Sequence, residues 1–296
     1  MVEPVAFGFN TQTAVNNHFQ QNGVIDAQTI QPLALAEFQA MVDLLRSKDI
    51  QVLIMKDTLE PHTPDSIFPN NWFSFHGSKA AIYPMFAENR RLERRSCVFE
   101  IAKSAGFEVD KIKDYSSYEN ENIFLEGTGS MILDRVNKIA YAALSERTDL
   151  KLFKTFCSDF GYKAISYTAN QTVRNKRMPI YHTNVQLCVA NKYVVVCLDA
   201  IDNELERDLF CSTVVQSGKE IVEISETQMQ HFAGNMLQVA NKQGELFLVL
   251  SQTAYNSLTD IQIKTLNSYN QLLVPSVPTI EKLGGGSVRC MMAEIF

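Results

Sequence analysis

The order of predicted elements repeats along the chain, and this repeat constrains the fold more than any other feature. Each copy reads as two strands around a tight turn, then a helix, then a short strand, a ββαβ unit. The strand pairs begin near residues 72, 129, 185 and 236, at intervals of 57, 56 and 51 residues. A near-constant period of this length is typical of repeat architectures. The predicted pairs are 72–75 with 80–83, 129–133 with 139–144, 185–189 with 193–198, and 236–239 with 245–250; the helices are 88–105, 146–160, 203–217 and 258–270; the third strands are 108–112, 163–167, 220–224 and 271–274.

Partial copies remain at the two ends of the chain. Residues 287–296 read as a lone strand, and so do residues 2–9, which a helix at 32–48 and a strand at 51–55 follow. The two ends complete a fifth unit if they meet, as in radial propellers. We therefore expect an α/β fold of five ββαβ units in a ring closed by the termini, as a single catalytic domain, 1–296. The same pattern also fits an ordinary α/β sheet with mixed strands.

Composition excludes several classes of function. The formal net charge of −6 gives no basic surface for nucleic acid or anionic membranes. The first ten residues lack the pattern of a signal peptide, and the longest apolar runs are far shorter than a membrane span. We therefore expect a cytoplasmic protein with reduced cysteines. The six cysteines form no C-x-x-C pair, so no structural zinc site is expected. The chain also lacks a nucleotide-binding fingerprint, and no metal or cofactor is expected.

Residues with catalytic side chains recur at one phase of the repeat, just before or within the first strand of each pair. The five segments contain Asp65 to Asn71, Glu126, His182 to Asn184, Asn235 and Cys290. In a ring, equal phase means equal height and radius, so these side chains would meet on the axis. The pattern predicts a site with Cys, His and Glu contributed by separate units.

The segments at this phase resemble those of the pentein superfamily of guanidino-group-modifying enzymes, which has a five-bladed α/β-propeller fold. The stretches PDSIFPNNWFSFH, FLEGTGSMILD, LSERT and GGGSVRCMMAEIF are similar to motifs of dimethylarginine dimethylaminohydrolases. The PNNW form is similar to that of bacterial citrulline utilisation hydrolases. The resemblance extends over essentially the whole chain.

The resemblance implies a role for each of these residues. Cys290 would be the nucleophile, and His182 would protonate the leaving nitrogen and then deprotonate water. Glu126 would hold a substrate N–H or orient His182. The implied substrate contacts are Asp65, Asn71, Asn184, Asn235 and Arg147, the last as a clamp for a carboxylate. Arg147 also reads as an ordinary surface charge at a helix start.

Two positions depart from the family pattern. Asn70 and Asn71 stand where dimethylarginine hydrolases have an acid pair, and Asn184 stands where deiminases have an aspartate. Both changes remove carboxylates that would face a cation. An amide both donates and accepts, which suits a neutral ureido group. We therefore expect citrulline or a related ureido compound as substrate, while Glu126 and Asp65 leave a guanidinium substrate open.

Two other functions remain open at this stage. An amidinotransferase would pass the group from Cys290 to an amine instead of water. A non-enzymatic binding protein of the same fold would give no reason for Cys, His and Glu to share a phase. The expected partner is a small guanidino or ureido amino acid, with no nucleic acid and no membrane, and a homodimer is left open.

Overall fold

A computed structural model describes residues 1–21 and 27–295 as a mixed α/β fold. Four three-stranded sheets share one design: the first two strands are antiparallel, and the third runs parallel to the second. A tight turn joins the first two strands, so they are antiparallel. A helix connects the second strand to the third, and such a crossover allows the third to run parallel. The sheets are β3 (Phe73–His76), β4 (Lys79–Ile82) and β5 (Lys111–Asp114); β6 (Ile132–Asp134), β7 (Ile139–Ala143) and β8 (Lys163–Tyr167); β11 (Leu187–Val189), β12 (Tyr193–Val196) and β13 (Glu220–Glu223); and β14 (Leu237–Ala240), β15 (Leu246–Val249) and β16 (Gln271–Leu273).

Side-chain caps fix the helix starts in three of the four crossovers, whereas the helices of the first crossover have none. The Asp149 carboxylate accepts a hydrogen bond from the Leu152 amide, and Gly161 ends that helix in the left-handed conformation. Asn203, Ser251 and Thr259 cap later helices in the same way. The crossover helices are α2 (Glu88–Arg91) and α3 (Cys97–Ser104), α5 (Leu150–Phe160), α6 (Glu204–Gln216), and α8 (Gln252–Ser257) with α9 (Asp260–Tyr269).

The two ends of the chain lie together. β1 (Val2–Glu3) pairs in parallel with β2 (Met55–Lys56), and α1 (Ala27–Arg46) lies between them in sequence. Val2 shares an apolar cluster with Met55, Trp72 and Ile295. Trp72 is therefore a packing anchor at the junction of the N-terminal and C-terminal segments.

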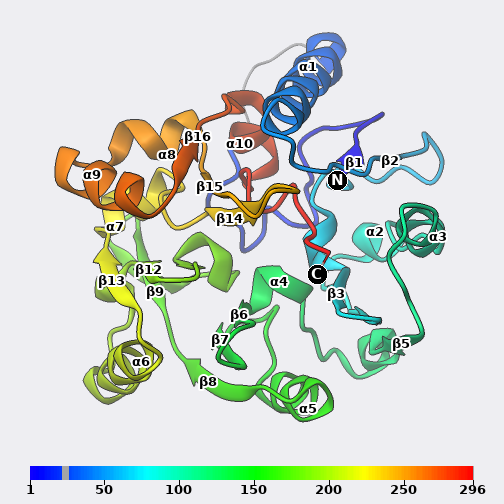
Figure 1. The fold of residues 1–296 in the computed structure, drawn as a ribbon. Coiled ribbons are helices and arrows are strands. Elements are labelled where there is room, and N and C mark those ends of the chain that lie inside the picture. Colours follow the sequence, from blue (N-terminus) through cyan, green and yellow to red (C-terminus); the bar gives the residue numbers. More distant parts are fainter. Residues whose placement is uncertain (22–26, 296) are drawn as a thin grey trace.

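Figure 1 shows the sheets following one another around a common centre in chain order, with α1, α3, α5, α6 and α9 toward the outside and α4 (Gly127–Ser130) near the centre. The strands form separate sheets, and no closed sheet joins them in the part of the chain that is described. The hydrophobic core is divided in the same way, into clusters that follow the sheets and their helices.

Several sequence expectations about individual elements are wrong. Residues 287–295 form no strand: the amides of Cys290, Met291 and Met292 each donate to the carbonyl three residues earlier in consecutive turns, and residues 292–295 are irregular. Phe296 lies outside the described residues. The strand expected at 2–9 stops at Glu3, because Pro4 has no amide hydrogen for a ladder. The helix expected at 88–105 is divided into α2 and α3, whereas α9 matches the helix expected at 258–270 and α8 precedes it.

Some of the observed elements have no counterpart in the expected repeat. A hairpin of β9 (Asn170–Val173) and β10 (Lys176–Pro179) is inserted after β8. α7 (Glu226–Gln230) follows β13, and α10 (Pro278–Gly284) precedes the turns that hold Cys290. In the described residues, no helix combines the length and apolar character required to cross a membrane.

Candidate active site

Short helical turns precede the first strands of the sheets, and they carry the residues of equal phase. These turns are η1 (Pro69–Asn71), α4 and η3 (Thr183–Val185). α4 and η3 include the first residues of the strands expected from 129 and 185, whereas η1 lies before the strand expected from 72. α4 packs against both other turns. Gly127 permits this approach, since its φ is +50° and a Cβ there would lie 2.3 Å from the Asn70 carbonyl oxygen. Side chains distant in sequence therefore converge at one place.

Cys290 lies between two buried amides. The Nδ2 atoms of Asn184 and Asn235 are each 3.2 Å from its Sγ. The thiol is nearly buried, with 3% of the residue exposed. The side chain of Arg289 turns away, toward the Met292 carbonyl and the Glu294 carboxylate.

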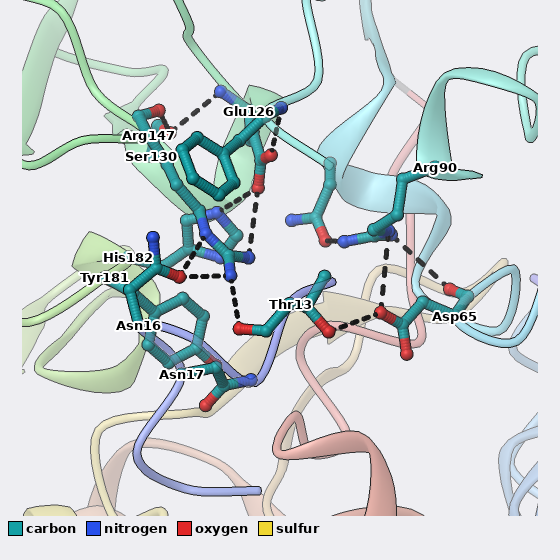
Figure 2. Close-up of polar contacts among 12 residues, drawn as sticks. Thr13, Asn16, Asn17, Asp65, Arg90, Glu126, Ser130, Arg147, Tyr181 and His182 are labelled. Carbon is teal, nitrogen blue, oxygen red and sulfur yellow. Dashed lines mark hydrogen bonds and ion pairs between the residues drawn. The ribbon is translucent and has the colours of Figure 1, made fainter. Parts of the chain in front are cut away.

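His182 and Glu126 form a buried pair. The Nε2 atom of His182 is 2.6 Å from Oε2 of Glu126, and the other carboxylate oxygen accepts from the Phe86 amide at 2.8 Å. Figure 2 shows the two side chains meeting beside Arg147. Because an ionised carboxylate only accepts, Nε2 of a neutral His182 carries the hydrogen, and Nδ1 is left for proton transfer.

Burial and neighbouring charges set the protonation of this pair. For His182, burial lowers the pKa to about 4, against the opposing effect of Glu126. For Glu126, burial works to raise the pKa, but Arg147, His182 and Arg90 outweigh it and hold the pKa at about 2. At neutral pH the pair is therefore a neutral imidazole that donates to a carboxylate.

Asp65 and Asn71 lie on the η1 side of the site, joined by Arg90. The guanidinium of Arg90 donates to Oδ1 of Asn71 at 2.7 Å and is held by both oxygens of Glu93. The carboxylate of Asp65 accepts from Asn10 and Thr13, and its other oxygen has no partner among the described residues. Burial raises the pKa of Asp65, with Arg90 the strongest opposing charge.

Arg147 is buried, with 1% exposure, so the interpretation of it as an ordinary surface charge is wrong. It lies in a turn before α5, where its guanidinium is 3.6 Å from Glu126 and stacks near the rings of Phe86 and Tyr181. It also donates to the Thr13 carbonyl and to Oδ1 of Asn16. Figure 2 shows these contacts linking Arg147 to the N-terminal segment.

Residues 10–21 pack against the site and cover part of it. Asn10 and Thr13 contact Asp65, and the side chain of Asn17 reaches the carbonyls of Gly284 and Gly285. Cavities of about 570 and 490 Å³ lie elsewhere, lined by none of Cys290, His182 or Glu126.

Sequence reasoning missed two parts of this site. Arg90 reads as one charge in the helical run ENRR, and Asn10, Thr13 and Asn16 lie in a segment outside the repeat. Residues 1–21 and 27–295 hold no cluster of three or more His, Cys, Asp or Glu side chains suited to a metal ion.

The arrangement provides a thiol, an imidazole with a free Nδ1, and a carboxylate, all shielded from water. It can support attack of the thiol on a planar carbon, with proton transfer by His182. Asp65, Asn71 and Asn184 each keep an unpartnered buried atom that a polar ligand could satisfy.

Comparisons with known proteins agree with this fold. The sequence profile of the eukaryotic N,N-dimethylarginine dimethylhydrolase family matches residues 3–296. No curated protein sequence matches the chain. Among solved structures, apo ArgZ, an arginine dihydrolase of the ornithine–ammonia cycle in cyanobacteria, has a TM-score of 0.74 at 14% identity; it covers 100% of this chain, which spans only 40% of ArgZ.

Two further structures carry ligands. The N-terminal domain of ArgZ, as a Cys-to-Ser variant bound to substrate, has a TM-score of 0.73 at 13% identity and covers 100% of this chain and 97% of its own. A dimethylarginine dimethylaminohydrolase variant, an adduct with S-methyl-L-thiocitrulline, has a TM-score of 0.61 at 14% identity, with coverages of 97% and 96%. At these identities the likeness establishes the fold.

Proposed function

Because the chain belongs to the N,N-dimethylarginine dimethylhydrolase family of the pentein superfamily, we propose that it is a cysteine-dependent hydrolase of guanidino or ureido groups, with citrulline as the favoured substrate. Cys290 is the nucleophile, His182 the proton carrier and Glu126 its partner. The five units form a propeller, and residues 1–296 act as one catalytic domain.

The orientation of the Asn71 amide is the observation that supports a ureido substrate. Arg90 has only donors, so the atom of Asn71 that faces it is Oδ1, and Nδ2 faces the site with no partner among the described residues. A Cβ on Gly129 would lie 2.3 Å from this Nδ2 and 2.8 Å from Nδ1 of His182, so these two atoms lie around the same point. A guanidinium offers no acceptor to Nδ2, whereas a ureido oxygen does.

Two acceptors of the site suit the N–H groups of a ureido substrate. Oδ1 of Asn184 and Oδ1 of Asp65 are buried without partners, and each can accept a ureido N–H. One donor and two acceptors match the C=O and the N–H groups of –NH–CO–NH₂. Each hydrogen bond to a neutral group is worth about 0.5–1.5 kcal/mol, and a buried unpaired donor costs more than that.

The reaction follows from these positions. The Cys290 sulfur attacks the ureido carbon as a thiolate, and Nδ2 of Asn71 donates to the oxygen as negative charge develops. A C–S bond forms, a C–N bond breaks, and His182, which takes up a proton from solvent at Nδ1, passes that proton to the leaving nitrogen. His182 then takes a proton from water, which attacks the S-linked carbon and releases the sulfur as a thiolate. The carbamic acid formed loses carbon dioxide, which breaks the second C–N bond. The net change is citrulline plus water to ornithine, ammonia and carbon dioxide.

An arginine substrate and a transferase are the competing functions. ArgZ is an arginine dihydrolase by name, and the buried Asp65 carboxylate suits a cation. A transferase would use an amine where the hydrolase uses water. Assays with glycine or lysine as acceptor separate the two, since only a transferase forms an amidino product.

Steady-state assays of purified protein test the substrate. Ammonia and ornithine are measured with citrulline, arginine, dimethylarginine, agmatine and succinylarginine. We expect the highest kcat/KM for citrulline. If the protein releases ammonia from arginine but not from citrulline, the proposed citrulline activity is wrong. Cytoplasmic location and a homodimer remain predictions.

A further inference from the structure

Asn235 is fixed in one orientation by a neighbour of the nucleophile. Its Oδ1 accepts from the Arg289 backbone amide at 3.0 Å. That amide can only donate, so the atom facing it is the oxygen, and Nδ2 is turned to the other side. There Nδ2 donates to the Asn184 carbonyl at 3.0 Å and lies 3.2 Å from Sγ of Cys290.

Asn184 approaches the same sulfur from a different unit. Its Nδ2 is also 3.2 Å from Sγ, and both asparagines are fully buried, with 0% exposure. η3 supplies Asn184, and the turn before β14 supplies Asn235. Two amide donors therefore converge on one sulfur in a site shielded from water.

Within the described residues, Sγ accepts no hydrogen bond from a charged group. The titratable groups of the surrounding elements have other partners in the described structure: Tyr181 with the Gly285 carbonyl, His182 with Glu126, Arg147 with Asn16 and Thr13, Arg90 with Glu93 and Asn71, Asp65 with Asn10 and Thr13, and Arg289 with Glu294. The negative charge of a thiolate would thus be met first by the two amides.

We propose that Asn184 and Asn235 form a thiolate-holding amide pair, which stabilises Cys290 in its ionised form in the free enzyme, before any substrate binds. Asn235 is a positioning residue in this account, since it acts through Cys290. A thiolate accepts hydrogen bonds far better than a thiol, so two N–H donors at 3.2 Å favour ionisation. The proton leaves for solvent in the free enzyme.

This arrangement has a consequence for the substrate, and it rests on the proposed role of Cys290. A cationic substrate can favour ionisation of the thiol by its positive charge. A neutral ureido group has no such charge and cannot favour ionisation of Cys290. The amide pair supplies the same stabilisation from the protein itself. A neutral substrate therefore finds the nucleophile already charged.

Alkylation of Cys290 by iodoacetamide, without substrate, tests the amide pair. The rate is followed across pH 5 to 10 by mass spectrometry of the Cys290 peptide, which separates it from the other five cysteines. Asn235→Asp keeps the acceptor for the Arg289 amide but replaces the donor by an oxygen that carries negative charge. We expect alkylation at pH 7 to slow at least about tenfold, with the midpoint of the profile moved up by about one pH unit or more. Asn235→Ala should shift in the same direction by less.

A structural role predicts the opposite order, because Asp fills the space of Asn and Ala leaves a gap. Asn270→Ala is the matched control: Asn270 is also buried and hydrogen-bonded, to Tyr193, Gln238 and Leu266, and its profile should equal that of the unmodified protein. Asn184→Ala, which removes the other donor, gives an independent test if Asn235→Ala fails to fold.

The outcomes are separate from those of the activity assay. Unchanged profiles in Asn235→Asp and Asn184→Ala would overturn the amide pair even if citrulline is hydrolysed. An upward shift in both would support the pair even if the enzyme prefers arginine.

Discussion

His182 Nε2 and Glu126 Oε2 lie 2.6 Å apart in a site where both side chains are almost fully buried. The pair gives the stability of the protein a specific pH dependence. Burial lowers the His182 pKa from 6.5 to about 4, so the unfolded chain binds this proton first as pH falls. The folded state therefore loses about 1.4 kcal/mol per pH unit through His182 between pH 6.5 and 4.

His182→Gln, which keeps a donor for Glu126, should remove this slope. Unfolding by urea at pH 7, 5.5 and 4.5 measures it as the difference between the variant and the unmodified protein. The difference is needed because burial also lowers the pKa of His76, to about 3, and this acts in the same direction. Parallel stability curves for the two proteins would contradict the burial of a neutral His182.

Gly129→Ala should abolish most activity while the protein stays folded. The new Cβ would lie 2.3 Å from Nδ2 of Asn71 and 2.8 Å from Nδ1 of His182, so both groups must shift. A displacement of about 1 Å can cost about 100-fold in rate. Gly8→Ala is the control, because nothing lies within 4 Å of its Cβ position. Equal kcat/KM in the two variants would show that the site does not use this close approach.

Asn71→Asp should reverse the preference for a neutral substrate. Arg90 keeps one oxygen of the new side chain, and the other brings a negative charge where Nδ2 now donates. We expect the ratio of kcat/KM for citrulline to that for arginine to fall about 100-fold. Asn256→Asp adds the same charge on the exposed surface of α8 and should leave the ratio unchanged. An unchanged ratio in Asn71→Asp would remove Asn71 from the substrate contacts.

Arg147→Lys tests the proposed carboxylate clamp. Lysine keeps the charge but loses the planar fork that lies between Phe86 and Tyr181. With citrulline, the fold increase in KM should be at least about ten times larger than the fold decrease in kcat. With a butylurea analogue that lacks the α-amino acid end, the variant and the unmodified enzyme should differ much less. An equal loss with both substrates would assign Arg147 to holding Glu126 and the N-terminal segment instead.

Much of the site follows from the phase of the repeat. Glu126, His182, Asn184 and Asn235 lie in turns before successive first strands, and these turns meet near one centre. Cys290 joins them from the turns near the C-terminal end. Sequence periodicity reports such turns, since each hairpin repeats the alternation of apolar residues. Periodicity predicts the order of the elements better than it predicts the residues at which they begin and end.

The remaining parts depend on contacts that no local pattern encodes. Arg147 and Thr13 are 134 residues apart in the chain, and Asn10 and Asp65 are 55 apart. The run around Cys290 has apolar residues that also suit a strand, but hydrogen bonds between residues three apart form turns there. Tertiary packing decides between these local alternatives.

The most direct test of the central claim is acid-quench mass spectrometry of the Cys290 peptide during citrulline turnover. We predict a carbamoyl-type or ornithine-containing group on Cys290 while substrate remains, and unmodified peptide after it is consumed. Cys290→Ala should give neither the adduct nor ammonia. Full turnover by Cys290→Ala, or an adduct on another cysteine with Cys290 unmodified, would contradict the assignment of Cys290 as nucleophile.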